Sequence, residues 1–299
     1  MRLPLLLSAA LLVGAAPLTS AAAVPGPCDG WKATDLATGL GVLENLLPDR
    51  TGIYYSESSA VMRWTRTGGA ATVAPASSPG GLRVKDGALW FVTGDGSRSG
   101  ALGTADGTIE RLDLRTNKLT TWATGLTMPN GFTFLADGSA LTSRDVSGLH
   151  PTGITRVVRG KVQESWSDQN DSNGLAVDPT GTWLYSDETF TYGSKVFRTE
   201  IARPSHRTVV AKLGGPGVPK GLDDLTLASS GALYVAANSG GEVIRLDPRT
   251  GASCVVAAGL TTVSSVRQGA GGAFPANRLY ATTFSGRLVE ITPPAGVTP

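Results

Sequence analysis

The sequence predicts an all-β protein, a six-bladed β-propeller of four-stranded blades. Short runs rich in β-branched and aromatic residues recur along the chain, and most of them follow a glycine-containing turn. No segment keeps a sustained helical period of apolar residues. One frame, made of a short strand, a glycine turn and a second strand, repeats six times. About 46 residues are available for each copy, which is the size of a four-stranded propeller blade.

The first segment, residues 1–23, is typical of a secretory signal peptide. Arg2 precedes an apolar run, and small residues at 19–23 end in the pattern that signal peptidases cut. The run is too short and too diluted by Ala, Gly and Pro for a membrane anchor. We therefore expect cleavage near Ala23, a secreted protein (extracellular or periplasmic), and no membrane contact afterwards. Residues 24–299 are expected to form a single propeller domain.

The chain contains two cysteines, Cys28 and Cys254. An oxidising compartment favours joining them, and the bridge would tie the start of the exported chain to a segment near its end. In the chain-entropy model, closing so long a loop stabilises the folded protein by roughly 4–5 kcal/mol. The alternative is two free thiols.

The six copies of the frame recur along the whole chain after the first cysteine. They occupy residues 43–58, 79–94, 129–145, 172–188, 222–238 and 263–284. The second strands are the clearest runs: IYYSES (53–58), ALWFVTG (88–94), TWLYSDE (182–188), ALYVAAN (232–238) and RLYATTF (278–284). A further strand and turn, such as 109–117 or 242–251, completes each copy.

Charge and composition exclude several classes of function. The formal net charge is +2 with no basic run, which argues against a nucleic-acid partner. Two His and two Cys leave oxygen as the main ligand for any metal. No G-x-S-x-G motif supports a serine hydrolase. The glycine-rich stretch 94–103 precedes no predicted helix, so we interpret it as a long loop of the second blade rather than a phosphate site.

One position of the frame is expected to face the central channel. The innermost strand of a propeller blade lines this channel, so the residue just before it lies at one mouth. The six residues at this position are Glu44, Gly80, Asn130, Asn173, Asp223 and Ser264. Carboxylate and amide oxygens are ligands for a hard divalent cation, so we expect Ca²⁺, with Zn²⁺, Mn²⁺ or Mg²⁺ as alternatives. Taken singly, Asn and Asp before a strand are also ordinary turn residues.

These residues carry a resemblance to a known family. Glu44, the PNGFTF segment with Asn130, SNGLAVDPTGTWLY with Asn173, and KGLDDLTLASSGALYVA with Asp223 resemble the senescence marker protein/gluconolactonase family. The resemblance implies that Glu44, Asn173 and Asp223 bind one divalent metal and that Asn130 contacts the substrate. It also implies hydrolysis of a lactone or ester, for which we expect Asp223 to act as the base.

The sequence departs from the family pattern at two positions. Met128 stands where sugar-lactone members have an Arg, and Asp224 replaces a Gly after the metal-binding Asp. Met128 offers an apolar contact, so we expect a less hydroxylated substrate than gluconolactone, with Trp90 and Phe91 as candidate apolar neighbours. The carboxylate of Asp224 is expected to point away from the channel.

The predicted function is therefore that of a secreted, metal-dependent lactonase or esterase. It would act as a monomer on a small molecule. Two alternatives remain open: a non-catalytic binding module with a structural metal, and a propeller of the strictosidine-synthase-like group. Other polar residues are expected to lie on the surface: Asp145, Asp187 and Glu188 solvated or turn-bonded at strand ends, and His150 in a loop.

Overall fold

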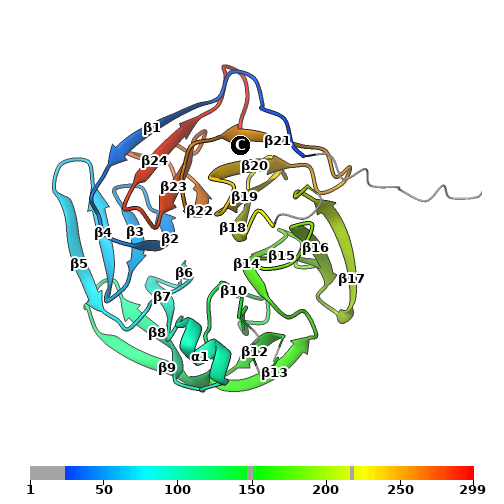
Figure 1. Cartoon of the computed structure of the whole chain (residues 1–299). Helices are drawn as coiled ribbons and strands as arrows, with labels where there is room; N and C mark the ends of the chain where they lie inside the picture. The colour runs from blue at the N-terminus through cyan, green and yellow to red at the C-terminus, as the bar shows by residue number, and fades with distance from the viewer. Residues whose placement is uncertain (1–23, 147, 149–150, 152, 216–218) are drawn as a thin grey trace, which may run out of the picture.

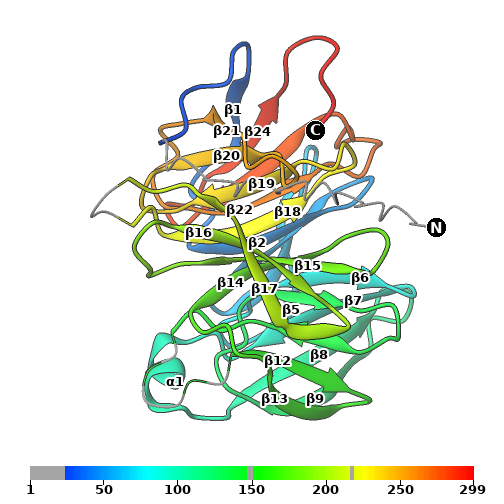
Figure 2. The same cartoon turned by 90° about the vertical axis from the view of Figure 1, so that its right-hand side faces the viewer.

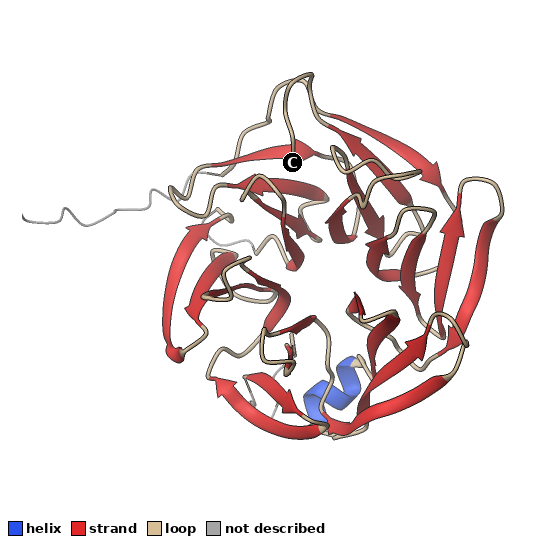
Figure 3. Cartoon of the chain, turned by 180° about the vertical axis from the view of Figure 1, so that it is seen from behind, coloured by secondary structure: helices blue, strands red, loops and turns tan. Residues whose placement is uncertain are grey.

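Six antiparallel sheets of four strands are arranged around a central axis (Figures 1 and 3). The computed structural model describes residues 24–146, 148, 151, 153–215 and 219–299. The predicted signal peptide and His150 lie outside these described residues. The prediction of an all-β, six-bladed propeller with four-stranded blades is confirmed.

The first three blades follow the chain from the innermost strand outwards. Blade 1 consists of β2 (Leu43–Pro48), β3 (Ile53–Glu57), β4 (Ala60–Thr65) and β5 (Gly69–Pro75). Blade 2 consists of β6 (Leu82–Lys85), β7 (Ala88–Thr93), β8 (Gly107–Asp113) and β9 (Leu119–Leu126). Blade 3 consists of β10 (Phe132–Phe134), β11 (Ala140–Thr142), β12 (Ile154–Val158) and β13 (Lys161–Ser167).

The other three blades complete the ring. Blade 4 consists of β14 (Ser172–Val177), β15 (Trp183–Glu188), β16 (Lys195–Glu200) and β17 (Arg203–Lys212). Blade 5 consists of β18 (Leu222–Leu227), β19 (Leu233–Ala237), β20 (Glu242–Leu246) and β21 (Ser253–Ala257). Blade 6 consists of β22 (Val263–Gln268), β23 (Leu279–Thr283), β24 (Leu288–Thr292) and β1 (Lys32–Ala37).

The core lies between the blades. The second strand β19, with the sequence LYVAA, is buried along its whole length, because neighbouring blades cover both of its faces. The outer strand β13 is mostly exposed and carries polar residues. Tyr234 of blade 5 and Leu279 of blade 6 share one apolar cluster. The innermost strands that border the channel are thereby packed into a continuous core.

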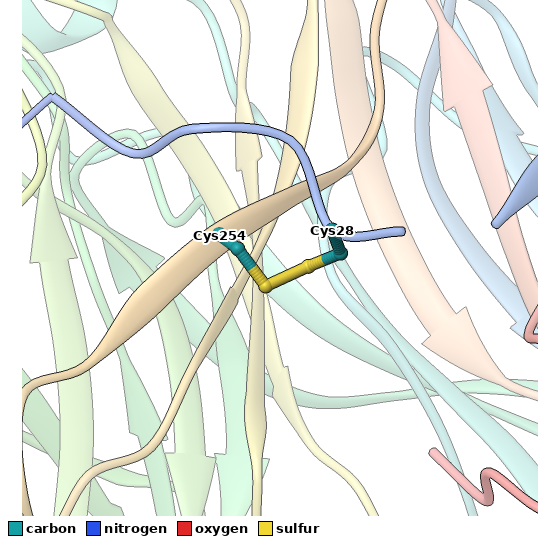
Figure 4. The surroundings of a disulfide bond; sticks show 2 residues. All are labelled: Cys28 and Cys254. Atoms are coloured by element: carbon teal, nitrogen blue, oxygen red, sulfur yellow. A yellow bond between two sulfur atoms is a disulfide. The ribbon is translucent and has the colours of Figure 1, made fainter. Parts of the chain in front are cut away.

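The N-terminal strand closes the ring. β1 pairs antiparallel with β24, so the last blade contains both ends of the chain (Figure 1). The predicted disulfide is confirmed: Cys28 and Cys254 are bonded, with their Cα atoms 5.2 Å apart (Figure 4). Cys254 belongs to β21, so the bridge ties the N-terminal segment to blade 5. A backbone hydrogen bond from the Cys28 N–H to the Val255 carbonyl (2.7 Å) reinforces this contact.

We expect the double variant Cys28→Ser, Cys254→Ser to fold but to melt about 10 °C lower than the wild type. The bridge closes a loop with a sequence separation of 226 residues, which is worth roughly 4–5 kcal/mol in the chain-entropy model. Pairing of β1 with β24 keeps the ring closed without it. Thermal unfolding by circular dichroism, with reduced wild type as the control, checks this. Equal melting temperatures would show that the β1–β24 pairing alone closes the ring.

One short helix corrects the expectation for residues 94–103. The stretch contains α1 (Ser97–Leu102), which lies at one face of the ring (Figure 2). A Cβ at Gly100 would come within 2.2 Å of the Met128 Sδ atom, so the glycine permits close packing of α1 on Met128. In the described residues no helix is long and apolar enough to span a membrane.

Candidate active site

β-Bulges place the predicted site residues at the channel. In β2, β14 and β18, two residues of the inner strand oppose one residue of its neighbour at Glu44–Asn45, Asn173–Gly174 and Asp223–Asp224. A bulge adds a residue and re-aims side chains, and bulges of this kind occur next to active sites. The strands therefore begin one residue before Glu44, Asn173 and Asp223, rather than just after them as the frame predicted.

The channel mouth forms a chamber of about 440 Å³. Three of the predicted site residues, Glu44, Asn130 and Asp223, lie in its wall, and so does Met128. The remaining lining residues are Asp95, Ser97, Asp145, Thr189, Phe190, Gly221, Asn238, Ser239 and Phe284. Four of the lining side chains are carboxylates, and none of those described is a Lys, Arg or His. The chamber is therefore strongly acidic.

Asp223 is held by amides on both sides. The side-chain amide of Asn173 donates to Asp223 Oδ1 at 3.0 Å, and that of Asn238 donates to Oδ2 at 2.8 Å. The Asn173 amide also reaches the Thr189 hydroxyl at 3.2 Å, and this hydroxyl donates to the Leu222 carbonyl at 2.8 Å. These bonds fix the orientation of a carboxylate that is only 5% exposed. Asn173 lies behind Asp223 rather than in the chamber wall.

Several buried oxygens in this region lack a hydrogen-bond donor. The Oδ1 atoms of Asn130, Asn173, Asp95 and Asp145 are fully buried and have no partner among the described residues. An unpaired buried acceptor costs about 1–3 kcal/mol. A divalent cation among amide and carboxylate oxygens would supply the missing partner. The donor set thus fits a hard cation, although no three Asp, Glu, His or Cys side chains among the described residues form a metal-binding group on their own.

The carboxylates of the chamber have raised pKa values. Desolvation, and next the negative charge of Asp145, raises the pKa of Glu44 to about 8. Desolvation also raises the pKa of Asp145 to about 6. The pKa values of Asp95 and Asp223 lie well above the usual range for aspartate, first because of desolvation and then because of the charge on Glu44. The amide of Asn130 opposes the shift at Glu44 by hydrogen bonding to its charged form. Without a cation the site therefore favours protonated carboxyl groups.

These shifts predict how the stability of the metal-free protein depends on pH. A carboxyl whose pKa is raised on folding binds its proton more tightly in the folded state, so stability falls as pH rises from the unfolded to the folded pKa. For Glu44 that window runs from 4.5 to about 8. We expect the melting temperature of chelator-treated protein to fall across this window, and to fall less steeply in Glu44→Gln. A melting temperature that is constant or rises with pH would contradict the burial of these charges.

Some of the sequence predictions for this region are wrong. Asp145 lines the chamber instead of lying in solvent. Asp187 is fully buried and accepts a hydrogen bond from the Gly174 N–H at 2.8 Å, and Glu188 is only 8% exposed. Ser264 does not line the chamber: its hydroxyl donates to the Leu43 carbonyl at 2.6 Å and ties blade 6 to blade 1.

The apolar neighbours of the substrate were also predicted wrongly. Phe91 is fully buried in the core between blades 1 and 2, and Trp90 packs against Trp122 in the next cluster. Phe190, which is 63% exposed, and Phe284 take their place in the chamber wall. Asp224 is absent from the chamber wall, and its carboxylate pairs with Arg267 at 2.5 Å.

The frame missed a second set of chamber residues. Asp95, Asp145, Thr189, Asn238 and Phe284 each follow the second strand of a blade within three residues. Because the first two strands of a blade are antiparallel, the end of the second lies at the same mouth as the start of the first. This spacing was visible in the repeat, and it would have placed both aspartates in the site.

The fold and the acidic chamber define a six-bladed propeller with a candidate ligand site at one mouth of its channel. Residues 146–285 match the SMP-30/Gluconolactonase/LRE-like region. The resemblance to the senescence marker protein/gluconolactonase family is thereby confirmed. Asn173 and Asp223 lie within the matched residues, whereas Glu44 and Asn130 precede them. Comparison with curated proteins found no match.

Solved structures with the same fold include three proteins with different names. A gluconolactonase of Xanthomonas campestris is 19% identical, with a TM-score of 0.67 over 92% of this chain and 98% of that one. A calcium-binding regucalcin of Agrobacterium tumefaciens is 17% identical, with a TM-score of 0.67 over 92% and 100%. Virginiamycin B lyase of Staphylococcus aureus is 12% identical, with a TM-score of 0.57 over 88% and 98%. At these identities the likeness shows the fold alone, because one fold serves several chemistries.

Proposed function

We propose that this protein is a secreted, divalent-cation-dependent hydrolase of a small lactone or ester, acting in the chamber. The observation that carries the proposal is the coincidence of four carboxylates with unpartnered amide oxygens of Asn130 and Asn173. The family match over residues 146–285 and the fold shared with a gluconolactonase support a lactonase-type activity.

Glu44, Asn173 and Asp223 would hold the cation. We propose Ca²⁺, because it accepts carboxylate and amide oxygens in irregular arrangements and completes its shell with water. The calcium-binding regucalcin with the same fold supports this choice. When bound, the cation would polarise the substrate carbonyl and stabilise the oxyanion that develops on it.

Asp223 is proposed to act as the general base. Its carboxylate is oriented by Asn173 and Asn238, and a bound cation would keep it deprotonated and therefore able to accept a proton. It would take a proton from water while the water oxygen bonds to the carbonyl carbon. The ring or ester C–O bond then breaks, and Asp223 returns the proton to the departing alkoxide. A hydroxy acid, or an acid and an alcohol, is the product.

The chamber wall favours a substrate with few hydroxyl groups. Met128, Phe190 and Phe284 present apolar surface on it. Met128 has a φ of 44°, which is rare for a large side chain, and it packs under Gly100 of α1. A sugar lactone would leave hydroxyl groups without partners against this surface, at about 1–3 kcal/mol for each.

We expect kcat/KM for an alkyl-substituted lactone to exceed that for gluconolactone by about tenfold, or 1.4 kcal/mol of transition-state binding. Met128→Arg should narrow or reverse this ratio, because a guanidinium group can donate to sugar hydroxyls. Met128→Leu, which keeps an apolar side chain, is the matched control and should preserve it. A tenfold preference of the wild type for gluconolactone would show that other residues supply the missing donors.

A panel of lactones and aryl esters, assayed with Ca²⁺ and with chelator, tests the proposed function. Turnover that disappears with chelator and returns with Ca²⁺ is the expected result. A chelator that lowers the melting temperature, with no substrate turned over, would favour a binding module with a structural metal. Turnover that is unaffected by chelator would contradict the cation's role and leave the strictosidine-synthase-like alternative open.

We also propose that the protein is exported and acts as a monomer without a nucleic-acid or membrane partner. The Cys28–Cys254 disulfide supports export, since such bonds persist in extracellular and periplasmic compartments. N-terminal sequencing of secreted protein should find a start near residue 24.

A further inference from the structure

A second pocket lies further along the same channel. Its volume is about 260 Å³, and all six innermost strands contribute to it. One residue from each blade, three positions after the channel-facing position of the frame, forms a ring around it: Leu47, Arg83, Thr133, Ala176, Thr226 and Arg267. Val177 and Leu227 complete the wall. We call these eight residues the second ring.

The regular spacing has a structural cause. A residue three positions along a strand normally faces the opposite side, because side chains alternate. The bulges at Glu44–Asn45, Asn173–Gly174 and Asp223–Asp224 each add one residue, so Leu47, Ala176 and Thr226 face the channel again. The two sets share no residue, so the second ring is a separate site.

The second ring has unbalanced positive charge. Arg267 is 7% exposed and forms an ion pair with Asp224, with 2.5 Å between Nη1 and Oδ2. Arg83 donates to the carbonyls of Leu82 at 2.7 Å and Leu175 at 3.0 Å, and no carboxylate among the described residues forms an ion pair with it. Two guanidinium groups and one carboxylate leave a single positive charge. Arg83 and Arg267 line the same pocket, and desolvation and the charge of Arg267 lower the pKa of Arg83 to about 9.

The polar and apolar side chains of the second ring follow a definite order around the channel. The strands that carry Arg83 and Arg267 flank the strand of Leu47, and the Arg83 guanidinium reaches across to the Leu175 carbonyl of blade 4. Thr133 and Thr226 come next, and Ala176 stands across the channel from Leu47. Guanidinium groups bind carboxylates through paired hydrogen bonds. The apolar wall would face the rest of the ligand.

We propose that the second ring binds a small organic monocarboxylate, whose carboxylate lies between Arg83 and Arg267 and whose apolar part lies against the apolar side chains of the second ring. The single excess positive charge matches one carboxylate. This site does not depend on the proposed hydrolase activity, because none of its residues lines the chamber.

Calorimetric titration of the full chain with benzoate, in the presence of chelator, tests the proposal. The chelator removes any cation that could hold benzoate in the chamber. We expect saturable binding of benzoate and at least tenfold weaker binding of benzamide, which has the same shape without the charge. Arg83→Gln should weaken benzoate binding at least tenfold, whereas Arg249→Gln, which changes an exposed arginine on blade 5, should leave it unchanged.

Several outcomes would overturn the proposal. They are equal binding of benzoate and benzamide, no saturation up to about 10 mM benzoate, and equal effects of Arg83→Gln and Arg249→Gln. Should Arg83→Gln not fold, Arg83→Lys replaces it: it keeps the charge and loses the paired donors, so binding should weaken several-fold with the wild-type melting temperature retained. Undiminished binding by that variant would likewise exclude recognition by Arg83.

Discussion

Replacing Asp223 with asparagine is expected to lower kcat/KM for the best lactone or ester about a thousandfold. A positioned general base contributes about 10²–10⁴-fold to a rate, and an amide cannot accept the proton of water. The introduced amide would keep one oxygen toward the cation, and the amides of Asn173 and Asn238 would lose a charged partner. The variant therefore removes the base while leaving most of the chamber in place.

The control for this variant is Asp86→Asn. Asp86 lies in the turn between β6 and β7, its side chain is 79% exposed, and its φ of 50° suits asparagine equally well. The Asp86→Asn variant should have wild-type activity. Metal content must be measured in both proteins. Activity that survives in Asp223→Asn with the cation still bound would show that Asp223 is not the base. Loss of both activity and bound cation would identify Asp223 as a ligand of the cation.

Glu44→Gln is expected to abolish both turnover and stabilisation by Ca²⁺. Glu44 supplies one of the two carboxylates of the proposed cation site, and the neutral glutamine side chain resembles the protonated side chain of the metal-free protein. Ca²⁺ at a hundred times its Kd should stabilise the wild type by about 2.7 kcal/mol. That corresponds to a rise of about 5–10 °C in melting temperature for a domain of this size.

The matched control is Glu164→Gln, which changes an exposed glutamate on the outer strand β13. It should respond to Ca²⁺ as the wild type does. Thermal unfolding with and without Ca²⁺, together with a turnover assay, gives both readouts. An equal response of Glu44→Gln and the wild type to Ca²⁺ would place the cation elsewhere or exclude it.

The repeat in the sequence was sufficient to predict the blades and part of the site. Its register placed Glu44, Asn130 and Asp223 at one mouth, because these residues share one position of the repeat. The disulfide could be predicted because the chain has two cysteines and was expected to be exported to an oxidising compartment. Neither prediction required knowledge of contacts between blades.

Other features depended on contacts that the repeat does not encode. Residues 94–103 fold into α1 because Gly100 packs on Met128 of the next blade, a long-range contact without a local helical pattern. Trp90 and Phe91 look like candidates for an apolar pocket, but adjacent blades bury them.

A crystal structure of the protein grown with Ca²⁺ tests the central claim most directly. We expect one ion in the channel, about 2.3–2.6 Å from carboxylate oxygens of Glu44 and Asp223 and from the Asn173 Oδ1 atom. The amide oxygen of Asn173, which lacks a donor among the described residues, is the decisive contact. A chamber that stays free of metal at saturating Ca²⁺, or an ion bound away from these three side chains, would contradict it.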